Sequence, residues 1–371
     1  MKRIGIVGLP NAGKSSLFRA LSRQAAEVAP YPFTTVEPNV AVVPIPDPRL
    51  DQVARVLNAS PVVYETIELR DIAGLVRGAH RGEGLGNRFL AQIREVDAVV
   101  VVVRAFSAPD VPHPDGRVDP VADAELLETE LLFADLERVE ERLERARRRA
   151  RSLERAAVAE RDWLEALKAR LERGQPARGL EPPEDAPQAA RELGAITAKP
   201  FLYVANVDEG SALEPPAELV AHVARRGAHA IAVSARLEAE LAELEPAEAE
   251  AMRRDLGFSE GVLERVVGAA FRLLGLVVFF TAHEGAEARA HAVPAGTVAR
   301  RAAREVHSDM ERGFVAAEVV AWNDLVAAGS LQAARERALL RTEGRDYLVR
   351  DGDVLRFRFT PPRVSAGRAA G

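Results

Sequence analysis

Short, dense runs of apolar residues alternate with stretches of helical periodicity through much of the chain. The first run, residues 3–8, has the density of a strand buried on both faces, and a glycine-rich turn separates it from helical spacing over residues 15–21. Similar runs lie at residues 64–69, 98–103, 201–205 and 230–233. Strands that alternate with helices are typical of a mostly parallel sheet, so we predict an α/β domain.

The hydrophobic pattern changes to a seven-residue period between about residues 124 and 193. Its apolar positions alternate spacings of four and three, as in the seam of a coiled coil. They are Leu132, Leu136, Val139, Leu143, Ala146, Ala150, Leu153 and Ala157. Because strands resume after Lys199, the chain must return to where it left the sheet. We therefore predict an inserted antiparallel helical hairpin, whose turn is marked by no Gly or Pro.

A third pattern begins near residue 276. Short β-like runs lie at residues 277–281, 314–319, 347–349 and 354–359. Asp351-Gly352-Asp353 predicts a hairpin between the last two, because glycine adopts positive φ without steric cost. This region is typical of a small α+β domain.

These patterns divide the chain into four parts. We expect a discontinuous α/β domain over residues 1–122 and 198–275, a helical insertion over 123–197, an α+β domain over 276–360 and a disordered tail over 361–371.

Length and composition narrow the class of protein. A chain of 371 residues, 47% of them hydrophobic, suits two or three domains with their own cores. No run reaches the 18 apolar residues of a membrane-spanning helix, so we expect no membrane partner. With no cysteine and no secretory pattern at the N-terminus, we expect a cytoplasmic location.

Charge is unevenly distributed. The net charge of −6 argues against a surface that coats nucleic acid as a whole. Residues 141–155 nevertheless hold seven Arg against three Glu. A solvated helix face and an RNA-contacting arm both explain this stretch.

Residues 8–15 match the phosphate-binding loop G-x-x-x-x-G-K-[ST], and they lie between a strand and a helix, where that loop must lie. We expect backbone N–H groups to surround the β-phosphate, Lys14 to bridge the β and γ oxygens during catalysis, and the Ser15 hydroxyl to bind Mg²⁺. The nucleotide-binding residues of this loop are Asn11, Ala12, Gly13, Lys14, Ser15 and Ser16.

Two further segments contain residue types that nucleotide-dependent switch proteins use to contact Mg²⁺ and the γ-phosphate. Asp71 begins a D-x-x-G sequence after a strand, so we expect its carboxylate in the outer coordination sphere of Mg²⁺ and the Gly74 N–H near the γ-phosphate. Thr35, preferred over Thr34, offers the hydroxyl that completes Mg²⁺ coordination. Leu75 occupies the position where many GTPases hold a water-orienting Gln. Either intrinsic hydrolysis is slow, or another polar group or a cation, such as a monovalent ion, positions the water.

Asn206-Val-Asp-Glu209 occupies the place of the guanine-reading N-K-x-D sequence and departs from it twice. Glu209 is longer than Asp, and Val207 removes the Lys, so the match to guanine weakens and we predict a preference for ATP. Ser234-Ala235-Arg236 corresponds to the S-A-K loop behind the base. We assign the base site to Asn206, Val207, Glu209, Ser234 and Ala235.

Several stretches together resemble the YchF family of Obg-related GTPases. Beside the phosphate loop and residues 206–209, they are residues 31–39, 71–76, 82–90, 307–314 and 343–353. The resemblance runs from Lys2 to about Thr360. It implies an Obg-type G domain with a coiled-coil insertion and a C-terminal TGS domain of ubiquitin-like β-grasp fold. Residues 283–291 depart from the family pattern.

The resemblance also implies function. Family members bind ribosomes, prefer ATP to GTP and have an apolar residue where Leu75 stands. A family histidine before the coiled coil is associated with hydrolysis, and His113 matches it. We therefore expect a Mg²⁺-dependent, monomeric ATPase that binds GTP more weakly and has the ribosome, its large subunit and RNA, as partner. The alternatives are a GTP-binding Obg-like module with incidental hydrolysis and an RNA-tethering scaffold.

Overall fold

The computed structural model describes residues 1–28, 39–72, 85–108, 110–113, 116–209, 214–257 and 260–361. The chain forms two compact units, one from Met1–Val43 and Ile67–Leu273 and the other from Pro44–Thr66 and residue 274 onward. The sequence division had kept residues 44–66 in the first domain. They group with the second unit because β3 (Val62–Val63) pairs with β9 (Ala288–Pro294).

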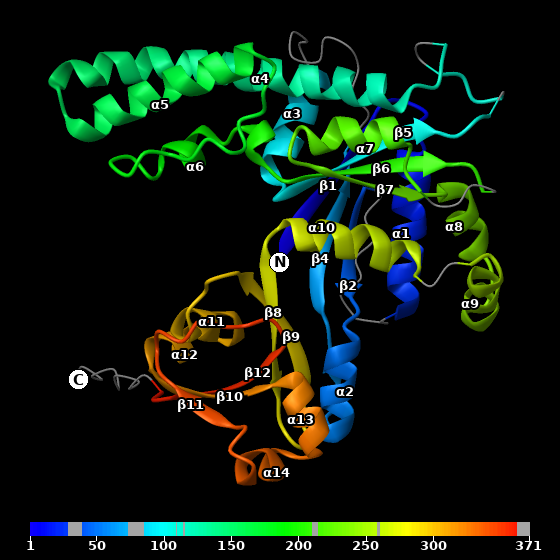
Figure 1. The fold of residues 1–371 in the computed structure, drawn as a ribbon, viewed down its shortest axis with the longest axis vertical. Coiled ribbons are helices and arrows are strands. Elements are labelled where there is room, and N and C mark those ends of the chain that lie inside the picture. Colours follow the sequence, from blue (N-terminus) through cyan, green and yellow to red (C-terminus); the bar gives the residue numbers. More distant parts are fainter. Residues whose placement is uncertain are drawn as a thin grey trace, which may run out of the picture. The chain divides into compact units, whose positions relative to one another are not determined.

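A six-stranded sheet in the order β2-β4-β1-β5-β6-β7 forms the centre of the first unit (Figure 1). Its strands are β1 (Lys2–Gly8), β2 (Val40–Ile45), β4 (Glu65–Asp71), β5 (Ala98–Ala105), β6 (Phe201–Val207) and β7 (His229–Val233). β1 is parallel to β4 and β5, and parallel pairing continues through β6 and β7. β5 and β6 are buried almost throughout, which explains their unbroken apolar sequences. The predicted α/β fold is confirmed.

Helices pack against this sheet. α3 (Leu85–Glu95), the first turns of α4 (Pro120–Arg149) and α7 (Ala217–Ala224) share one apolar core with the strands. α1 (Lys14–Val28) contacts β1, and α10 (Gly268–Leu273) contacts β5 and β6. The other elements of this unit are α5 (Arg155–Glu172), α6 (Ala189–Leu193), α8 (Ala235–Leu241), α9 (Pro246–Asp255), the 3₁₀ segments η1 (Ala150–Ser152) and η2 (Ile196–Ala198), and the π-helical η3 (Leu263–Val267).

α4 and α5 form the inserted hairpin, and their side-chain pairs show that the two helices are antiparallel (Figure 1). The turn lies at η1 and Leu153, whose φ of 58° is left-handed. Leu153 is 82% exposed, so its expected place in the apolar seam was wrong. The helix ends before it, and the seven-residue pattern cannot continue through a turn. Val139, Leu143, Leu164 and Leu167 do lie in the core between the helices.

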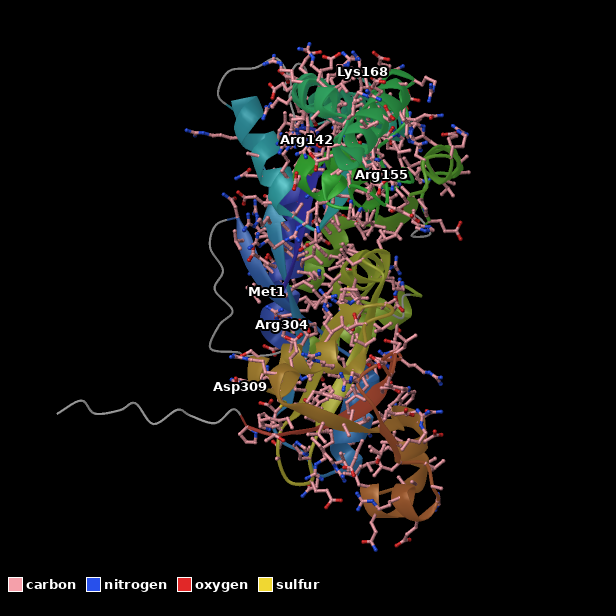
Figure 2. The ribbon with its side chains drawn as sticks, turned by 90° about the vertical axis from the view of Figure 1, so that its left-hand side faces the viewer. Met1, Arg142, Arg155, Lys168, Arg304 and Asp309 are labelled. Carbon is pink, nitrogen blue, oxygen red and sulfur yellow. The ribbon has the colours of Figure 1, made fainter. Side chains whose placement is uncertain are left out.

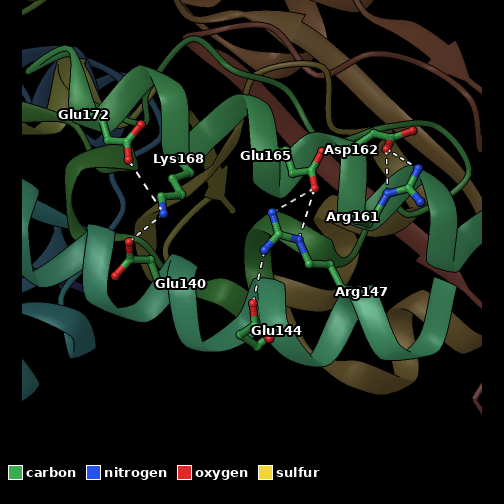
Figure 3. Close-up of polar contacts among 8 residues, drawn as sticks. All are labelled: Glu140, Glu144, Arg147, Arg161, Asp162, Glu165, Lys168 and Glu172. Carbon is green, nitrogen blue, oxygen red and sulfur yellow. Dashed lines mark hydrogen bonds and ion pairs between the residues drawn. The ribbon is translucent and has the colours of Figure 1, made fainter. Parts of the chain in front are cut away.

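Ion pairs join the outer faces of the hairpin. Lys168 Nζ lies 2.7 Å from Glu140 Oε1, and Arg147 Nη2 lies 3.2 Å from Glu165 Oε1 (Figure 3). Figure 2 labels Arg142, Arg155 and Lys168 on the same insertion. Arg142 is paired with Glu160 and Glu192. Much of the Arg-rich stretch is therefore neutralised by acidic residues that lie far from it in sequence.

The second unit holds a six-stranded sheet in the order β11-β10-β12-β8-β9-β3. β8 (Leu276–Ala282) is antiparallel to β9, and β10 (Phe314–Ala321) is antiparallel to β11 (Arg341–Glu343) and β12 (Asp353–Phe359). Its helices are α2 (Pro48–Val56), α11 (Ala299–Val306), α12 (Ser308–Arg312), α13 (Trp322–Ala328) and α14 (Leu331–Glu336). A small α+β domain was predicted here, and the structure contains one.

The hairpin expected around Asp351-Gly352-Asp353 does not form. Residues 347–349 make only an isolated bridge between Leu348 and Val298. The reason is that the turn bonds to β8 instead: the Gly352 N–H donates to Val278 O at 2.7 Å, and Asp351 Oδ1 accepts from Val278 N at 2.8 Å. β12 then pairs with β10.

None of the helices in the described ranges combines the length and the apolar character that crossing a bilayer requires.

Candidate nucleotide-binding site

The phosphate loop connects the end of β1 to the start of α1. Gly8 and Gly13 are required there for close packing. A Cβ on Gly8 would lie 2.5 Å from Val102 O, and one on Gly13, whose φ is 89°, would collide with the side-chain amide of Asn206. Glycine thus lets β5 and β6 approach this loop.

Asn206, at the end of β6, hydrogen-bonds to both the phosphate loop and the start of α8. Its side chain is buried, its Nδ2 donates to Ala12 O at 3.1 Å, and its Oδ1 accepts from Ala235 N at 2.9 Å. Ser234 caps α8 by accepting from Leu237 N. The structure therefore brings the phosphate loop and the predicted base-site residues around one buried amide, with Val207 buried beside it in β6.

Lys14, Ser15 and Asp71 form a polar cluster at the ends of β1 and β4. Lys14 Nζ hydrogen-bonds to Asp71 Oδ1, and Ser15 Oγ donates to Asp71 Oδ2 at 3.0 Å. The register explains this meeting, because Asp71 pairs with Ile6, two residues before the loop. A hydroxyl beside a carboxylate is the hard oxygen chemistry that Mg²⁺ prefers, so the residues present fit this ion. Ser16 follows at the exposed side of α1.

Glu209 and Asp208 point in different directions. Glu209 Oε1 lies 2.7 Å from Arg236 Nε, so the residue at the base-reading position is paired with the Arg of the Ser-Ala-Arg loop. Asp208 accepts from the backbone N–H of Ser107 at 3.1 Å. Asp208 therefore supports the loop after β5.

His113 lies in that loop, seven residues before α4 begins at Pro120. Asn11 of the phosphate loop donates to Pro112 O at 2.9 Å, which brings the residue before His113 to the phosphate loop. His113 Nε2 lies 3.2 Å from Asp123 Oδ2 in the first turn of α4. The remaining predicted residues, Thr35, Gly74 and Leu75, lie outside the described residues.

Sequence reasoning missed two residues that shape this loop. The Arg104 guanidinium donates to the backbone oxygens of Val111 at 2.8 Å and Ala108 at 3.1 Å. Asp123 holds the imidazole of His113. An Arg that ends an otherwise apolar buried strand was a usable signal for the first residue. Nothing local in the sequence marks Asp123, which looks like an ordinary acidic residue in a first helical turn.

A second buried acid joins the hairpin to the base-reading strand. Glu128 on α4 accepts from Tyr203 Oη of β6 at 2.5 Å and pairs with Arg226 Nε at 2.8 Å. His222 Nε2 lies 3.2 Å from the same carboxylate. Burial, together with the neighbouring Glu128, raises the pKa of Tyr203 well above its usual value, so its hydroxyl stays protonated and donates.

Three features of the first unit are typical of a P-loop nucleotide-binding domain of the GTPase class. They are the glycine-containing loop between β1 and α1, the cluster of Lys14, Ser15 and Asp71, and the buried Asn206 between that loop and the predicted base site. Residues 3–138 match the family model described as 50S ribosome-binding GTPase, and residues 276–360 match the YchF-GTPase_C model, described as a protein of unknown function (DUF933).

The chain belongs to the YchF family. It is 44% identical to the Ribosome-binding ATPase YchF of Bacillus subtilis, with 96% of this chain and 98% of that one covered. It is 45% identical to the protein of the same name from Haemophilus ducreyi, covering 96% and 99%. The solved structure of the Schizosaccharomyces pombe YchF GTPase matches with a TM-score of 0.85 and 32% identity, over 96% of this chain and 97% of that chain.

Proposed function

We propose that this chain is a Mg²⁺-dependent ATPase that acts as a ribosome-associated switch and prefers ATP to GTP. The observation that carries the proposal is the meeting of Lys14, Ser15 and Asp71 beside a phosphate loop that Asn206 holds in place. The curated relatives, which are named ribosome-binding ATPases, support both the activity and the partner.

Each of these groups has a separate role in phosphoryl transfer. Backbone N–H groups of the loop bind the phosphates, and the Lys14 ammonium neutralises charge that develops on the β and γ oxygens. Ser15, Thr35 and Asp71 would hold Mg²⁺, which when bound offsets negative charge on those oxygens. Asp71 holds Lys14 and Ser15 beside the loop through its carboxylate. We also propose that the Gly74 N–H contacts the γ-phosphate.

The base preference rests on residues 207 and 209. With Glu209 paired to Arg236 and Val207 in place of Lys, the site lacks the short carboxylate that accepts two guanine N–H groups. Binding of adenine does not require that acceptor. We therefore propose tighter binding of Mg·ATP than of Mg·GTP.

Water positioning falls to His113, because Leu75 offers no polar atom. The contact between Asn11 and Pro112 keeps the His113 loop beside the phosphate loop. A monovalent cation is the other candidate for this task. Without a partner, hydrolysis should be slow, roughly 10⁻⁴ to 10⁻² s⁻¹ as in unassisted switches.

The proposed setting is the cytoplasm, with the large ribosomal subunit and its RNA as partner of a monomeric protein. The helical insertion and the C-terminal unit, which we propose to be of the TGS type, offer surfaces for that contact.

Calorimetric titration with Mg·ATP and Mg·GTP tests the proposal, together with single-turnover hydrolysis by Lys14→Ala. We expect ATP to bind at least as tightly as GTP, and the Lys14 variant to lose hydrolysis because its ammonium contacts the transferred phosphoryl group. The double variant Val207→Lys, Glu209→Asp should move the preference toward GTP. A strong GTP preference in the unchanged protein would favour a GTP-binding Obg-like module, and undiminished hydrolysis without Lys14 would refute the site.

A further inference from the structure

One face of the C-terminal sheet carries a cavity. Val319 of β10 belongs to the apolar core that α11 covers, so Glu318 and Val320 project from the opposite face, because side chains alternate along a strand. The register with β12 places Arg356 opposite Glu318, and it places Val354 opposite Val320. These four side chains line a cavity of about 790 Å³ beside α14.

The cavity combines apolar surface with charged groups at its sides. Val320 and Val354 are buried, and Leu331 and Leu340 are half-buried on the side of α14. Glu284, in the turn between β8 and β9, lines the other side. A cavity of this size, with apolar walls and a few polar groups, is typical of sites for small organic molecules.

Glu318 holds two arginine side chains beside this cavity. The residue is 6% exposed, and its Oε1 accepts from Arg335 Nη2 at 3.3 Å and from Arg358 Nη2 at 2.5 Å. A guanidinium has five N–H groups, so both arginines keep donors for a ligand. Arg356 is exposed, and its side chain makes no hydrogen bond or ion pair among the described residues. The buried carboxylate thus fixes cationic donors next to an apolar surface.

We propose that this cavity binds a small organic carboxylate with an apolar body, such as an apolar amino acid or an arylalkyl carboxylic acid. A guanidinium matches a carboxylate with two parallel N–H···O bonds, and Val320 and Val354 bury the apolar body. The cavity is lined by two arginines and two glutamates, so a doubly charged phosphate meets more repulsion there than a carboxylate with one charge. The same acids suit the ammonium group of an amino acid.

Binding is tested on the full-length protein by NMR of labelled Leu and Val methyl groups, with 3-phenylpropionate and phenylalanine as probes. We expect both to shift the methyl signals of Val320, Val354 and Leu340 at millimolar concentration. 2-Phenylethylamine, which has the ring without the carboxylate, and phenyl phosphate should bind about 10-fold more weakly or less. Tighter binding of phenylalanine than of 3-phenylpropionate identifies an amino acid as the ligand class, and the reverse order identifies a simple carboxylic acid.

Two arginine variants locate the site. Arg356→Gln should weaken binding of 3-phenylpropionate by about 10-fold, because a charge-assisted hydrogen bond is lost. Arg301→Gln is the matched control, since Arg301 is an exposed arginine on α11, which covers the opposite face of the same sheet. It should leave binding unchanged. Both side chains are exposed, so both variants should keep the thermal stability of the unsubstituted protein.

The proposal is overturned if neither carboxylate shifts the methyl signals of the cavity, or if 2-phenylethylamine binds as well as they do. Tighter binding of phenyl phosphate, or equal losses in the two arginine variants, would also contradict it. Because binding is read at the cavity itself, none of these outcomes depends on the nucleotide site.

Discussion

The two halves of helix α4 are held in different ways. Near the sheet, the carboxylates of Asp123, Glu128 and Asp135 are buried and bonded to defined partners within the nucleotide-binding unit. Farther along, Glu140 and Arg147 meet α5 through ion pairs at half-exposed positions (Figure 3). Buried, hydrogen-bonded charges are costly to leave unpaired, whereas exposed pairs contribute little. We call the first half, residues 120–135, the joint and the second half, residues 136–149, the arm, whose exposed face meets α5 through solvated ion pairs.

The largest effect should come from breaking the joint at Glu128. Glu128→Ala leaves His222 and Arg226 without their buried carboxylate and should lower the free energy of unfolding by about 3 kcal/mol. Urea unfolding followed by Trp163 fluorescence in a Trp322→Phe background reports this unit, because Trp163 lies in the hairpin core. Glu137→Ala, an exposed acid on the same helix, is the control. Equal costs in the two variants would erase the distinction between joint and arm.

The second unit offers a separate test of burial, at His291. This ring is stacked on Phe279 and bonded to Thr281 Oγ1 at 2.9 Å, and burial, reinforced by Arg289, lowers its pKa to about 4. Since the unfolded value is about 6.5, the unfolded chain binds the proton first as pH falls. Stability should fall by about 3 kcal/mol between pH 6.5 and 4 and be fully present above pH 6.5.

Urea unfolding followed by Trp322 fluorescence in a Trp163→Phe background measures this pH dependence. His291→Phe should flatten the difference between pH 7 and pH 5, whereas His283→Gln, at an exposed turn position, should not. The same slope in all three proteins would assign the pH dependence to other groups.

At the joint's contact with the nucleotide site, His113→Ala should lower kcat by about 10²-fold with little change in nucleotide Kd, as expected for losing a water-orienting or acid–base contact. Hydrolysis is measured with and without ribosomes. Equal rates for both proteins in both conditions would make His113 a structural residue only.

The smallest effect is expected in the arm. Lys168→Ala removes the pairs to Glu140 and Glu172 and should leave both the free energy of unfolding and kcat close to those of the unsubstituted protein, because exposed pairs contribute little. The measurement is Trp163 fluorescence in urea at low and high salt. A loss of stability as large as that of Glu128→Ala would show that the arm is as specific as the joint.

The elements that depend only on a short stretch of sequence were predictable. The phosphate loop and five of the six strands of the first sheet follow from short runs of residue type, because a buried parallel strand is apolar and a phosphate loop must carry glycine where backbone packs on backbone. The edge strand β2 was not predicted. The seven-residue period likewise predicted the hairpin. The position of the turn was not predictable, because Leu153 adopts the left-handed φ there, where a turn usually has Gly.

Sequence by itself determined the P-loop class and the division into α/β and α+β parts, since each depends on neighbours along the chain. Only the tertiary structure decided the rest. It grouped residues 44–66 with the C-terminal strands, turned Asp351 and Gly352 toward β8, and brought Asp123 to His113. The physical reason is the same in each case. Hydrogen bonds between segments that are distant in sequence satisfy polar groups, and the local sequence does not indicate which distant partner each group will have.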